Sequence, residues 1–304
     1  MTARHHAHIP ARAVLLILGA VLCFSVLDTC IKYVSPRYPV PLLVWARWTV
    51  QAVAMLLWLA PTMGLDLVRT PQLRMQVVRG FLLIGSSAMF VTALKYLPLA
   101  EVTALNYTTP TVVILLAVAF LHEKMTRPRA ALVVAGVVGM MLIVRPGAQM
   151  FQGAAVLALG SAACYAVFQI LTRKLAGEDP RVTNFYPALV GTLVTSLLLP
   201  WIGMPARVEW IDAGLILFGG LLGTLGHFMF ILAFQRAPAS GLTPFTYVQL
   251  VWSTLLGWIV FAQFPDGFTL VGMAVIAGSG LALAVYERRH ALALPPVRDP
   301  TAYD

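Results

Sequence analysis

The segment 80–123 occurs a second time in the chain, and this repeat limits the folds open to the chain more than any other feature. A displacement of 140 positions places ten of its residues on identical ones. The identical pairs are Gly80–Gly220, Leu82–Leu222, Met89–Met229, Phe90–Phe230, Ala93–Ala233, Pro98–Pro238, Thr103–Thr243, Tyr107–Tyr247, Leu115–Leu255 and Leu116–Leu256. A displacement of 141 also aligns Gly19 with Gly160 and Cys23 with Cys164. The chain therefore consists of two halves of one design.

Composition places both halves in a membrane. Hydrophobic residues make up 60% of the 304 residues and charged residues only 11%, which is too few to give a soluble domain its polar surface. Apolar runs of roughly 20 residues, the length that spans the hydrocarbon layer, recur along the chain. The ten predicted spans are 13–34, 41–61, 76–97, 99–121, 130–145, 153–173, 184–201, 211–235, 238–261 and 268–286. The expected fold class is an all-α integral membrane protein with ten transmembrane helices.

Each half contains five helices, and this odd number predicts that the second half enters the membrane from the opposite side. The expected organisation is two inverted five-helix repeats, 13–145 and 153–286, between tails 1–12 and 287–304. Pro98 and Pro238 are interpreted as turns because proline suits the start of a helix; a long broken helix is the alternative. Inverted repeats are typical of secondary transporters, whose solute site lies near the midplane between the halves.

The distribution of basic residues predicts the orientation. With the N-terminus inside, 15 of the 21 lysines and arginines fall on the cytoplasmic side, so both termini are expected in the cytoplasm. We expect a multi-pass protein of the bacterial plasma (inner) membrane whose Arg288 and Arg289 contact anionic lipid. The net charge of +9 reflects this asymmetry, and no nucleic-acid partner is expected.

Motifs of catalysis do not occur in the sequence. It contains no H-E-x-x-H, no G-x-S-x-G, no G-x-x-x-x-G-K-[ST] phosphate-binding loop and no paired C-x-x-C. An enzyme is therefore not expected, and neither is a cofactor or a metal site. Without a nucleotide-binding loop the chain has no ATP motor, so energy is expected to come from a solute or proton gradient.

The ten spans, the run ALKYLPLAEVTALNYTTP, Glu123 in the sequence LHEK, and the glycines Gly136 and Gly139 together resemble the EamA family of the drug/metabolite transporter (DMT) superfamily. The likeness covers nearly the whole chain. It implies transport of amino acids, vitamins, nucleobases or related metabolites, with or without proton coupling. The second half departs from the family pattern, because Gln263 stands where the glutamate would recur.

Asp28 is the acidic residue placed deepest in a predicted span. Ser25, Asp28, Thr29 and Lys32 follow a spacing of i, i+3, i+4, i+7, which puts them on one helix face. Ionisable groups inside a membrane are expensive and tend to face a partner or a water-filled path. Asp28 is therefore a candidate proton-coupling group; the alternative is a structural pair with Lys32 one turn away.

Two predicted helices carry matching polar patches with aromatic residues. The predicted solute-binding residues there are Thr103, Asn106, Tyr107, Tyr247, Gln249 and Trp252. Hydroxyl and amide groups would orient a solute and the rings would stack on it. The alternative is hydrogen bonding between helices, or of the threonines with their own helix backbone. Pro110 removes one helix hydrogen bond close to the first patch.

Four further residues complete the predicted site. Tyr165 and Gln169 lie four apart and share a helix face that would line the cavity. The family resemblance implies that Arg47 contacts an anionic group of the solute; extension of its side chain to the membrane surface is the slightly preferred alternative, with Trp45 and Trp48 in an interfacial aromatic belt. His227 is a second candidate for proton coupling, or else a neutral interhelical donor.

The sequence thus favours a secondary transporter of small organic metabolites that works by alternating access. Export of amino-acid-like compounds is the preferred activity, and uptake of a vitamin or nucleobase such as riboflavin is the alternative. A membrane scaffold or receptor without transport is the hypothesis from another class; the duplicated polar patches disfavour it. The expected partners are a small organic solute, membrane lipids and, as the candidate coupling ion, protons.

Overall fold

The computed structural model describes residues 10–121, 125–145, 153–175, 177–201, 207–234, 236 and 239–291. Its elements in chain order are α1 (Ala11–Val34), α2 (Val40–Met63), η1 (Gly64–Val68), α3 (Leu73–Tyr96), α4 (Leu99–Asn106), α5 (Thr109–Leu121), α6 (Arg127–Val144), α7 (Gly153–Lys174), α8 (Pro180–Leu198), η2 (Leu199–Trp201), α9 (Trp210–Phe234), α10 (Ala239–Thr246), α11 (Val248–Phe261) and α12 (Gly267–Ala291). Ten segments of this described part are long and apolar enough to cross a membrane, which confirms the predicted all-α membrane fold.

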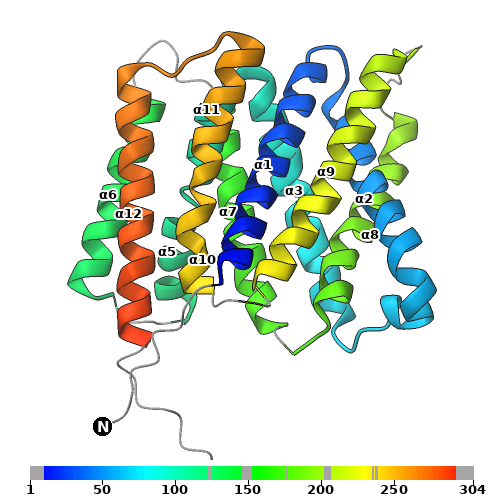
Figure 1. Cartoon of the computed structure of the whole chain (residues 1–304), viewed down its shortest axis with the longest axis horizontal. Coiled ribbons are helices and arrows are strands. Elements are labelled where there is room, and N and C mark those ends of the chain that lie inside the picture. Colours follow the sequence, from blue (N-terminus) through cyan, green and yellow to red (C-terminus); the bar gives the residue numbers. More distant parts are fainter. Residues whose placement is uncertain are drawn as a thin grey trace, which may run out of the picture.

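The first and last helices return the chain to the face from which it started. The start of α1 and the end of α12 lie on the same side of the bundle (Figure 1). We call this side the Ala11 face and the opposite one the Val34 face, after the two ends of α1. Pro98 lies between the end of α3 and the start of α4, so the predicted turn is confirmed there; Pro238 lies outside the described residues.

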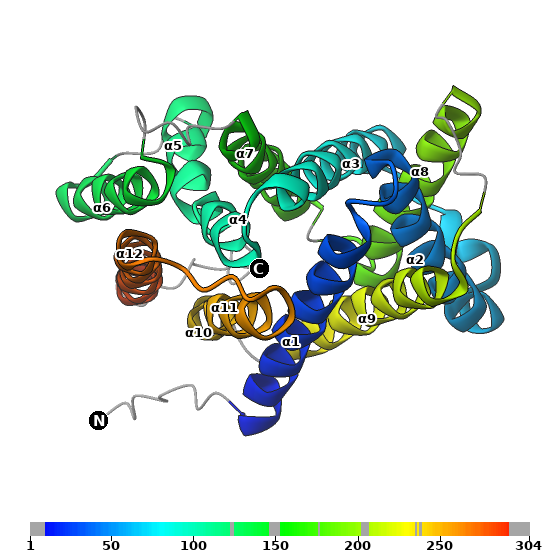
Figure 2. The same ribbon diagram turned by 90° about the horizontal axis from the view of Figure 1, so that it is seen from above.

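The two repeats interleave. Figure 2 shows α6, α7 and α3 along one side of the molecule and α12, α11, α1 and α9 along the other. The most extensive packing joins helices of different repeats: α1 with α9, α3 with α7, α6 with α12, and α2 with α8. Neither half therefore buries its apolar faces without the other, and the chain forms one intertwined body.

Glycines let the repeats approach closely at equivalent places. An added Cβ on Gly80 would lie 2.6 Å from the Val190 side chain, and one on Gly220 would lie 2.7 Å from that of Val50. The two valines are themselves 140 positions apart. In the same way Gly160 contacts Met89, and Gly19 contacts Met229. Several of the residues that the repeat keeps identical are thus the ones that join the repeats.

Two spans that the sequence predicts as continuous helices are broken. The span 99–121 divides into α4 and α5 at Tyr107 and Thr108, and the span 238–261 divides at Tyr247. Pro110 has no N–H to give to the Asn106 carbonyl, and the Thr109 hydroxyl donates to that oxygen instead, at 2.6 Å. The breaks occupy equivalent positions in the two repeats, because Tyr107 and Tyr247 are 140 positions apart.

Candidate functional site

The two broken helices meet inside the bundle. The hydroxyl of Tyr107, at the end of α4, lies 2.6 Å from the backbone carbonyl of Thr246 and 3.0 Å from the side-chain oxygen of Gln249. The Leu250 amide bonds to Tyr247 at 3.0 Å and so leaves the Thr246 carbonyl available to this hydroxyl. The break in one repeat is therefore joined to the break in the other by a side chain.

The two repeat-related tyrosines lie against each other. The ring centroids of Tyr107 and Tyr247 are 5.0 Å apart, with an angle of 42° between the ring planes. Tyr247 is buried, and its hydroxyl lies close to Gly280 of α12. A Cβ added to Gly280 would lie 1.6 Å from the hydroxyl oxygen of Tyr247. Gly280 thus provides the space that the Tyr247 ring occupies.

Charged and polar side chains from α1, α2, α7 and α9 extend this contact. The charges of Asp28 and Arg47 interact, Arg47 also interacts with Tyr165 and His227, and Tyr107 interacts with Asp28 and Tyr165. We call this group the central polar cluster; its members are Asp28, Arg47, Tyr107, Tyr165, His227, Tyr247 and Gln249. Its members come from six helices or from the breaks beside these helices.

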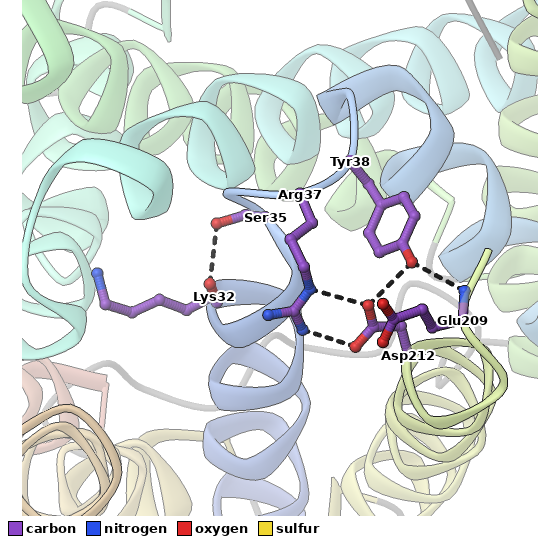
Figure 3. A network of polar contacts seen from close by, with 6 residues as sticks. All are labelled: Lys32, Ser35, Arg37, Tyr38, Glu209 and Asp212. Atoms are coloured by element: carbon purple, nitrogen blue, oxygen red, sulfur yellow. Dashed lines mark hydrogen bonds and ion pairs between the residues drawn. The ribbon is translucent and has the colours of Figure 1, made fainter. Parts of the chain in front are cut away.

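Asp28 and Lys32 point to different partners. The Lys32 ammonium donates to the carbonyls of Leu94 and Leu97, at the end of α3, at 2.9 and 2.6 Å. In Figure 3 its side chain extends away from the Arg37–Asp212 contact. Within the described residues Asp28 forms no salt bridge, and its carboxylate accepts no hydrogen bond from a side chain. The alternative of a structural Asp28–Lys32 pair therefore does not fit the geometry.

Arg47 lies in the interior. Its Nε is buried and has no hydrogen-bond partner in the described structure, and its guanidinium lies 5.4 Å from the ring centre of the buried Trp48. Trp48 is 1% exposed, so its placement in an interfacial belt is wrong. The enclosed Nε of the partly buried Arg47 fits a contact inside the bundle better than the preferred interpretation, extension of the side chain to the membrane surface. The physical reason is the position of Arg47 in its helix: α2 begins at Val40, two full turns before it.

Four predicted solute-binding residues remain, namely Thr103, Asn106, Gln169 and Trp252. The Thr103 hydroxyl donates to the Leu99 carbonyl at 2.8 Å, so it is occupied within its own helix, and the backbone carbonyl of Asn106 accepts the Thr109 hydroxyl. Gln169 interacts with the hydroxyl of Tyr165 beside the cluster. Trp252 has a buried Nε1 without a partner among the described residues.

His227 presents an unsatisfied nitrogen to the same region. Its ring meets the Phe24 ring edge to face, with centroids 4.9 Å apart, and its Nδ1 is buried without a partner in the described part of the chain. The expected interhelical hydrogen bond through this nitrogen is therefore not formed. Ser87, its counterpart 140 positions earlier, also has a buried and unpartnered hydroxyl.

A polar network joins the repeats at the Val34 face. Arg37, in the α1–α2 loop, contacts Asp212 of α9 through two nitrogens, at 2.8 and 2.6 Å. Tyr38 donates to the same carboxylate at 2.9 Å and accepts the Glu209 amide at 3.2 Å (Figure 3). The hydrogen bond to Asp212 raises the pKa of the Arg37 guanidinium above its ordinary value. We call this network the Val34-face latch.

A matching network joins the repeats at the Ala11 face. Glu178, in the α7–α8 loop, accepts hydrogen bonds from Thr70 at 2.7 Å and from Gln76 at 3.0 Å. Gln76 in turn accepts a 2.6 Å hydrogen bond from the buried Arg79, which also donates to Thr172. We call this network the Ala11-face latch. The displacement of 141 aligns Arg37 with Glu178, so the two latches start from equivalent loops of the two repeats.

Two further features lie outside the cluster. Arg145, after α6, forms a salt bridge with Asp266, before α12, and its hydrogen bonds hold the pKa of Asp266 well below its usual range. A cavity of about 660 Å³ opens between α2, α8 and α9, lined in part by Trp58, Asn184 and Phe228. None of the central polar cluster lines this cavity. Within the described residues, no three His, Cys, Asp or Glu side chains are grouped to hold a metal ion.

Inverted repeats whose discontinuous helices meet beside buried polar groups define a class of protein, the membrane transporters built on an internal two-fold symmetry. The chain belongs to the EamA-like transporter family, which it matches over residues 11–145 and 152–286. It is a multi-pass integral membrane protein and a small-molecule transporter rather than an enzyme.

Relatives of known function cover most of the chain. A riboflavin transporter of Vibrio cholerae is 28% identical over 95% of this chain and 97% of its own. A pseudopaline exporter of Pseudomonas aeruginosa is 29% identical over 89% of this chain and 95% of its own. An S-adenosylmethionine uptake transporter of Rickettsia conorii is 24% identical over 74% and 76%, respectively.

A solved crystal structure of a protein has the same fold. It superimposes with a TM-score of 0.66 at 21% sequence identity, and the match covers 91% of this chain and 98% of that one.

Proposed function

We propose that this protein is a secondary transporter that exports small amino-acid-like metabolites by alternating access, driven by a solute or proton gradient. The observation that carries the proposal is the contact between the two helix breaks, where Tyr107 of one repeat binds the Thr246 carbonyl of the other. A solute bound between the breaks would touch both repeats, so a movement of one repeat against the other would change its access.

The proposed solute site consists of the central polar cluster together with Gln169 and Trp252. Tyrosine rings and a tryptophan provide apolar contact area, and amide, hydroxyl and charged groups provide orientation. Asp28 and His227 are the proposed proton-coupling groups. We propose that the protein resides in the bacterial inner membrane with both termini in the cytoplasm, the orientation that the positive-inside rule favours.

Export is supported by the likeness to the pseudopaline exporter, and an amino-acid-like solute by the opposite charges of Asp28 and Arg47 in the cluster. The second candidate is uptake of riboflavin or a similar vitamin. It is supported by the likeness to riboflavin transporters and by the paired rings of Tyr107 and Tyr247, which suit a flat aromatic solute.

Flux through the purified protein tests the proposal. Proteoliposomes preloaded with a radiolabelled solute would be assayed for exchange, with amino acids, S-adenosylmethionine and riboflavin as test solutes. We expect saturable flux that the double substitution of Tyr107 and Tyr247 by alanine abolishes while the protein level stays unchanged. Equal flux in this variant would remove the tyrosines from the site, and no flux of any solute would favour the scaffold hypothesis.

Direction and coupling need separate assays. In everted membrane vesicles, an exporter that is driven by protons accumulates its solute when the interior is acidified. If Asp28 couples protons, flux through the Asp28→Asn variant should lose its dependence on pH, whereas unchanged dependence would clear Asp28 of that role.

A further inference from the structure

The charges of Asp28 and Arg47 form an unusual arrangement. Asp28 is buried, Arg47 is partly buried, and the two side chains lie close enough for their charges to interact. No nitrogen of Arg47 comes within 4.0 Å of a carboxylate oxygen of Asp28. Among the described residues Arg47 donates no hydrogen bond, its Nε is fully enclosed, and the Asp28 carboxylate accepts none. The two opposite charges thus face one region of the protein without satisfying each other.

Two other buried charges, those of Arg79 and Asp212, are satisfied by the protein itself. Arg79 is 2% exposed and donates to Gln76, Thr172 and Thr183. Asp212 is equally buried and receives the guanidinium of Arg37 and the hydroxyl of Tyr38. A buried charge without a partner is costly, by several kcal/mol on the usual scale. The sites of Asp28 and Arg47 are therefore the ones that a charged ligand would complete.

Neighbouring polar atoms point to the same conclusion. Ser25 lies one turn before Asp28 on the same face of α1, and its hydroxyl is buried without a partner in the described structure. His227 interacts with the charge of Arg47, and its Nδ1 is also unpartnered there. The region thus offers an acceptor and a hydroxyl around Asp28, and a guanidinium with an imidazole around Arg47.

We infer that Asp28 and Arg47 bind the two poles of a zwitterionic solute, with an ammonium group at Asp28 and a carboxylate at Arg47. A guanidinium is planar and binds a carboxylate through two parallel hydrogen bonds, while a carboxylate binds an ammonium as a point charge. Asp28 and Arg47 together carry no net charge, so a zwitterion leaves the loaded site neutral. A neutral vitamin would leave both side chains unpaired.

The inference rests on the proposed transport function and names the solute class of the same site. Its test uses L-phenylalanine, L-tyrosine and L-tryptophan, because the rings of Tyr107 and Tyr247 suit an aromatic side chain. Each would be offered in four forms: free, N-acetylated, as the carboxamide, and with both poles blocked. S-adenosylmethionine serves as a solute whose ammonium–carboxylate pair is accompanied by a further positive charge on sulfur, and riboflavin as a solute without such a pair.

Binding is measured as the ligand-induced rise in melting temperature of the full-length protein in detergent. We expect a free zwitterion to stabilise the wild-type protein, and loss of either pole to weaken its binding at least about tenfold, since one charged hydrogen bond contributes about 1.5–3 kcal/mol. This comparison needs no variant. Equal binding of blocked and free forms, or binding of riboflavin alone, overturns the inference.

Two variants then assign the poles. Asp28→Asn should abolish the difference between the free and N-acetylated forms and leave the penalty for the carboxamide. Arg47→Gln should do the reverse. Lys32→Gln is the matched control, because Lys32 lies on the same helix as Asp28 but binds backbone carbonyls; it should keep both differences. Variants that retain both differences overturn the assignment.

Flux separates this inference from the proposed function. Riboflavin flux that neither Asp28→Asn nor Arg47→Gln reduces would overturn the zwitterion site and leave transport intact. Absence of flux for every solute, in a protein that binds no zwitterion, would overturn both.

Discussion

Tyr107 connects the two repeats through one hydroxyl group, because that group reaches the Thr246 carbonyl and the Gln249 side chain. Tyr107→Phe keeps the ring and removes the hydroxyl. We expect a loss of stability of about 1 kcal/mol, the typical value of one hydrogen bond. Exchange flux in proteoliposomes should fall about tenfold, since 1.4 kcal/mol of lost solute binding corresponds to that factor.

Tyr186→Phe is the matched control for this prediction. The Tyr186 hydroxyl donates to the Val68 carbonyl, also at 2.6 Å, at a distance from the central polar cluster. The Tyr186→Phe variant should show a fall in melting temperature similar to that of Tyr107→Phe, with its flux preserved. If both variants lost flux in proportion to their stability, Tyr107 would have only a structural role.

Asp28 and Lys32 permit a second prediction at the scale of single residues. Lys32 binds the carbonyls of Leu94 and Leu97 and forms no ion pair with Asp28. The effects of Asp28→Asn and Lys32→Met on the free energy of unfolding should therefore be additive within about 0.5 kcal/mol. A thermodynamic cycle of the two single variants and the double variant measures this coupling. A coupling above about 1 kcal/mol would restore the structural pair.

Single residues show how far the sequence alone could predict the site. Asp28, Tyr107 and Tyr247 are conspicuous because polar groups are expensive in an apolar span. The interior position of Arg47 was missed because its place near the start of a predicted helix suited a membrane surface equally well. The Lys32 partners were also out of reach, because backbone carbonyls leave no trace in the residue pattern.

The helix breaks are the main feature at the scale of elements. Hydropathy predicts 99–121 and 238–261 as single spans, since a break of one or two residues does not interrupt an apolar run. Pro110 gave the signal for the first break, whereas the second repeat has Leu250 at the equivalent position, and Pro244 lies inside α10 before the break. What the sequence could not show is that the breaks meet, because their contact joins residues about 140 positions apart.

Gly280 of α12 tests the position of the second break. A Cβ at this residue would lie 1.6 Å from the Tyr247 hydroxyl, so Gly280→Ala must displace the ring from the Tyr107 contact. We expect binding of the solute to fall about 5- to 150-fold, because an overpacked site costs about 1–3 kcal/mol. A thermal-shift titration with the bound solute measures the loss.

Gly278→Ala is a control on the same helix. Among the described residues, no atom beyond its chain neighbours and its own helix backbone lies within 4 Å of the Cβ that it would add, and alanine favours an α-helix over glycine by about 1 kcal/mol. This variant should bind solute normally and melt at the same or a higher temperature. Normal binding by Gly280→Ala would show that the Tyr247 ring position does not matter to the site.

At the scale of the whole molecule, the repeat predicted both the fold and its symmetry. An odd number of helices per half requires inversion, and the structure adds that the halves interleave rather than stand side by side (Figure 2). Interleaving follows from packing: the glycines that the halves share fit against valines and methionines of the opposite half. Which helices pair across the repeats is a matter of three-dimensional contact, and one sequence does not contain it.

The two latches follow the same symmetry and should hold opposite faces of the protein closed. The loop after the first helix of each repeat binds the start of the third helix of the other repeat: Arg37 binds Asp212 at the Val34 face, and Glu178 binds Thr70 and Gln76 at the Ala11 face. Weakening one latch should favour the state that is open at that face, because a population shift follows the difference in free energy between the two states.

We therefore expect Asp212→Asn and Glu178→Gln to shift the protein in opposite directions, by about 5- to 30-fold for a change of about 1–2 kcal/mol in the equilibrium. A cysteine introduced at Ser87 in a cysteine-free background would be labelled by an impermeant maleimide from each side of oriented vesicles. Asp212→Asn should raise labelling from the Val34 face, and Glu178→Gln from the Ala11 face. Arg69→Gln, which removes an exposed ion pair within one repeat, should change neither rate. Equal changes from both faces would mean that the latches stabilise the fold as a whole and not one state of it.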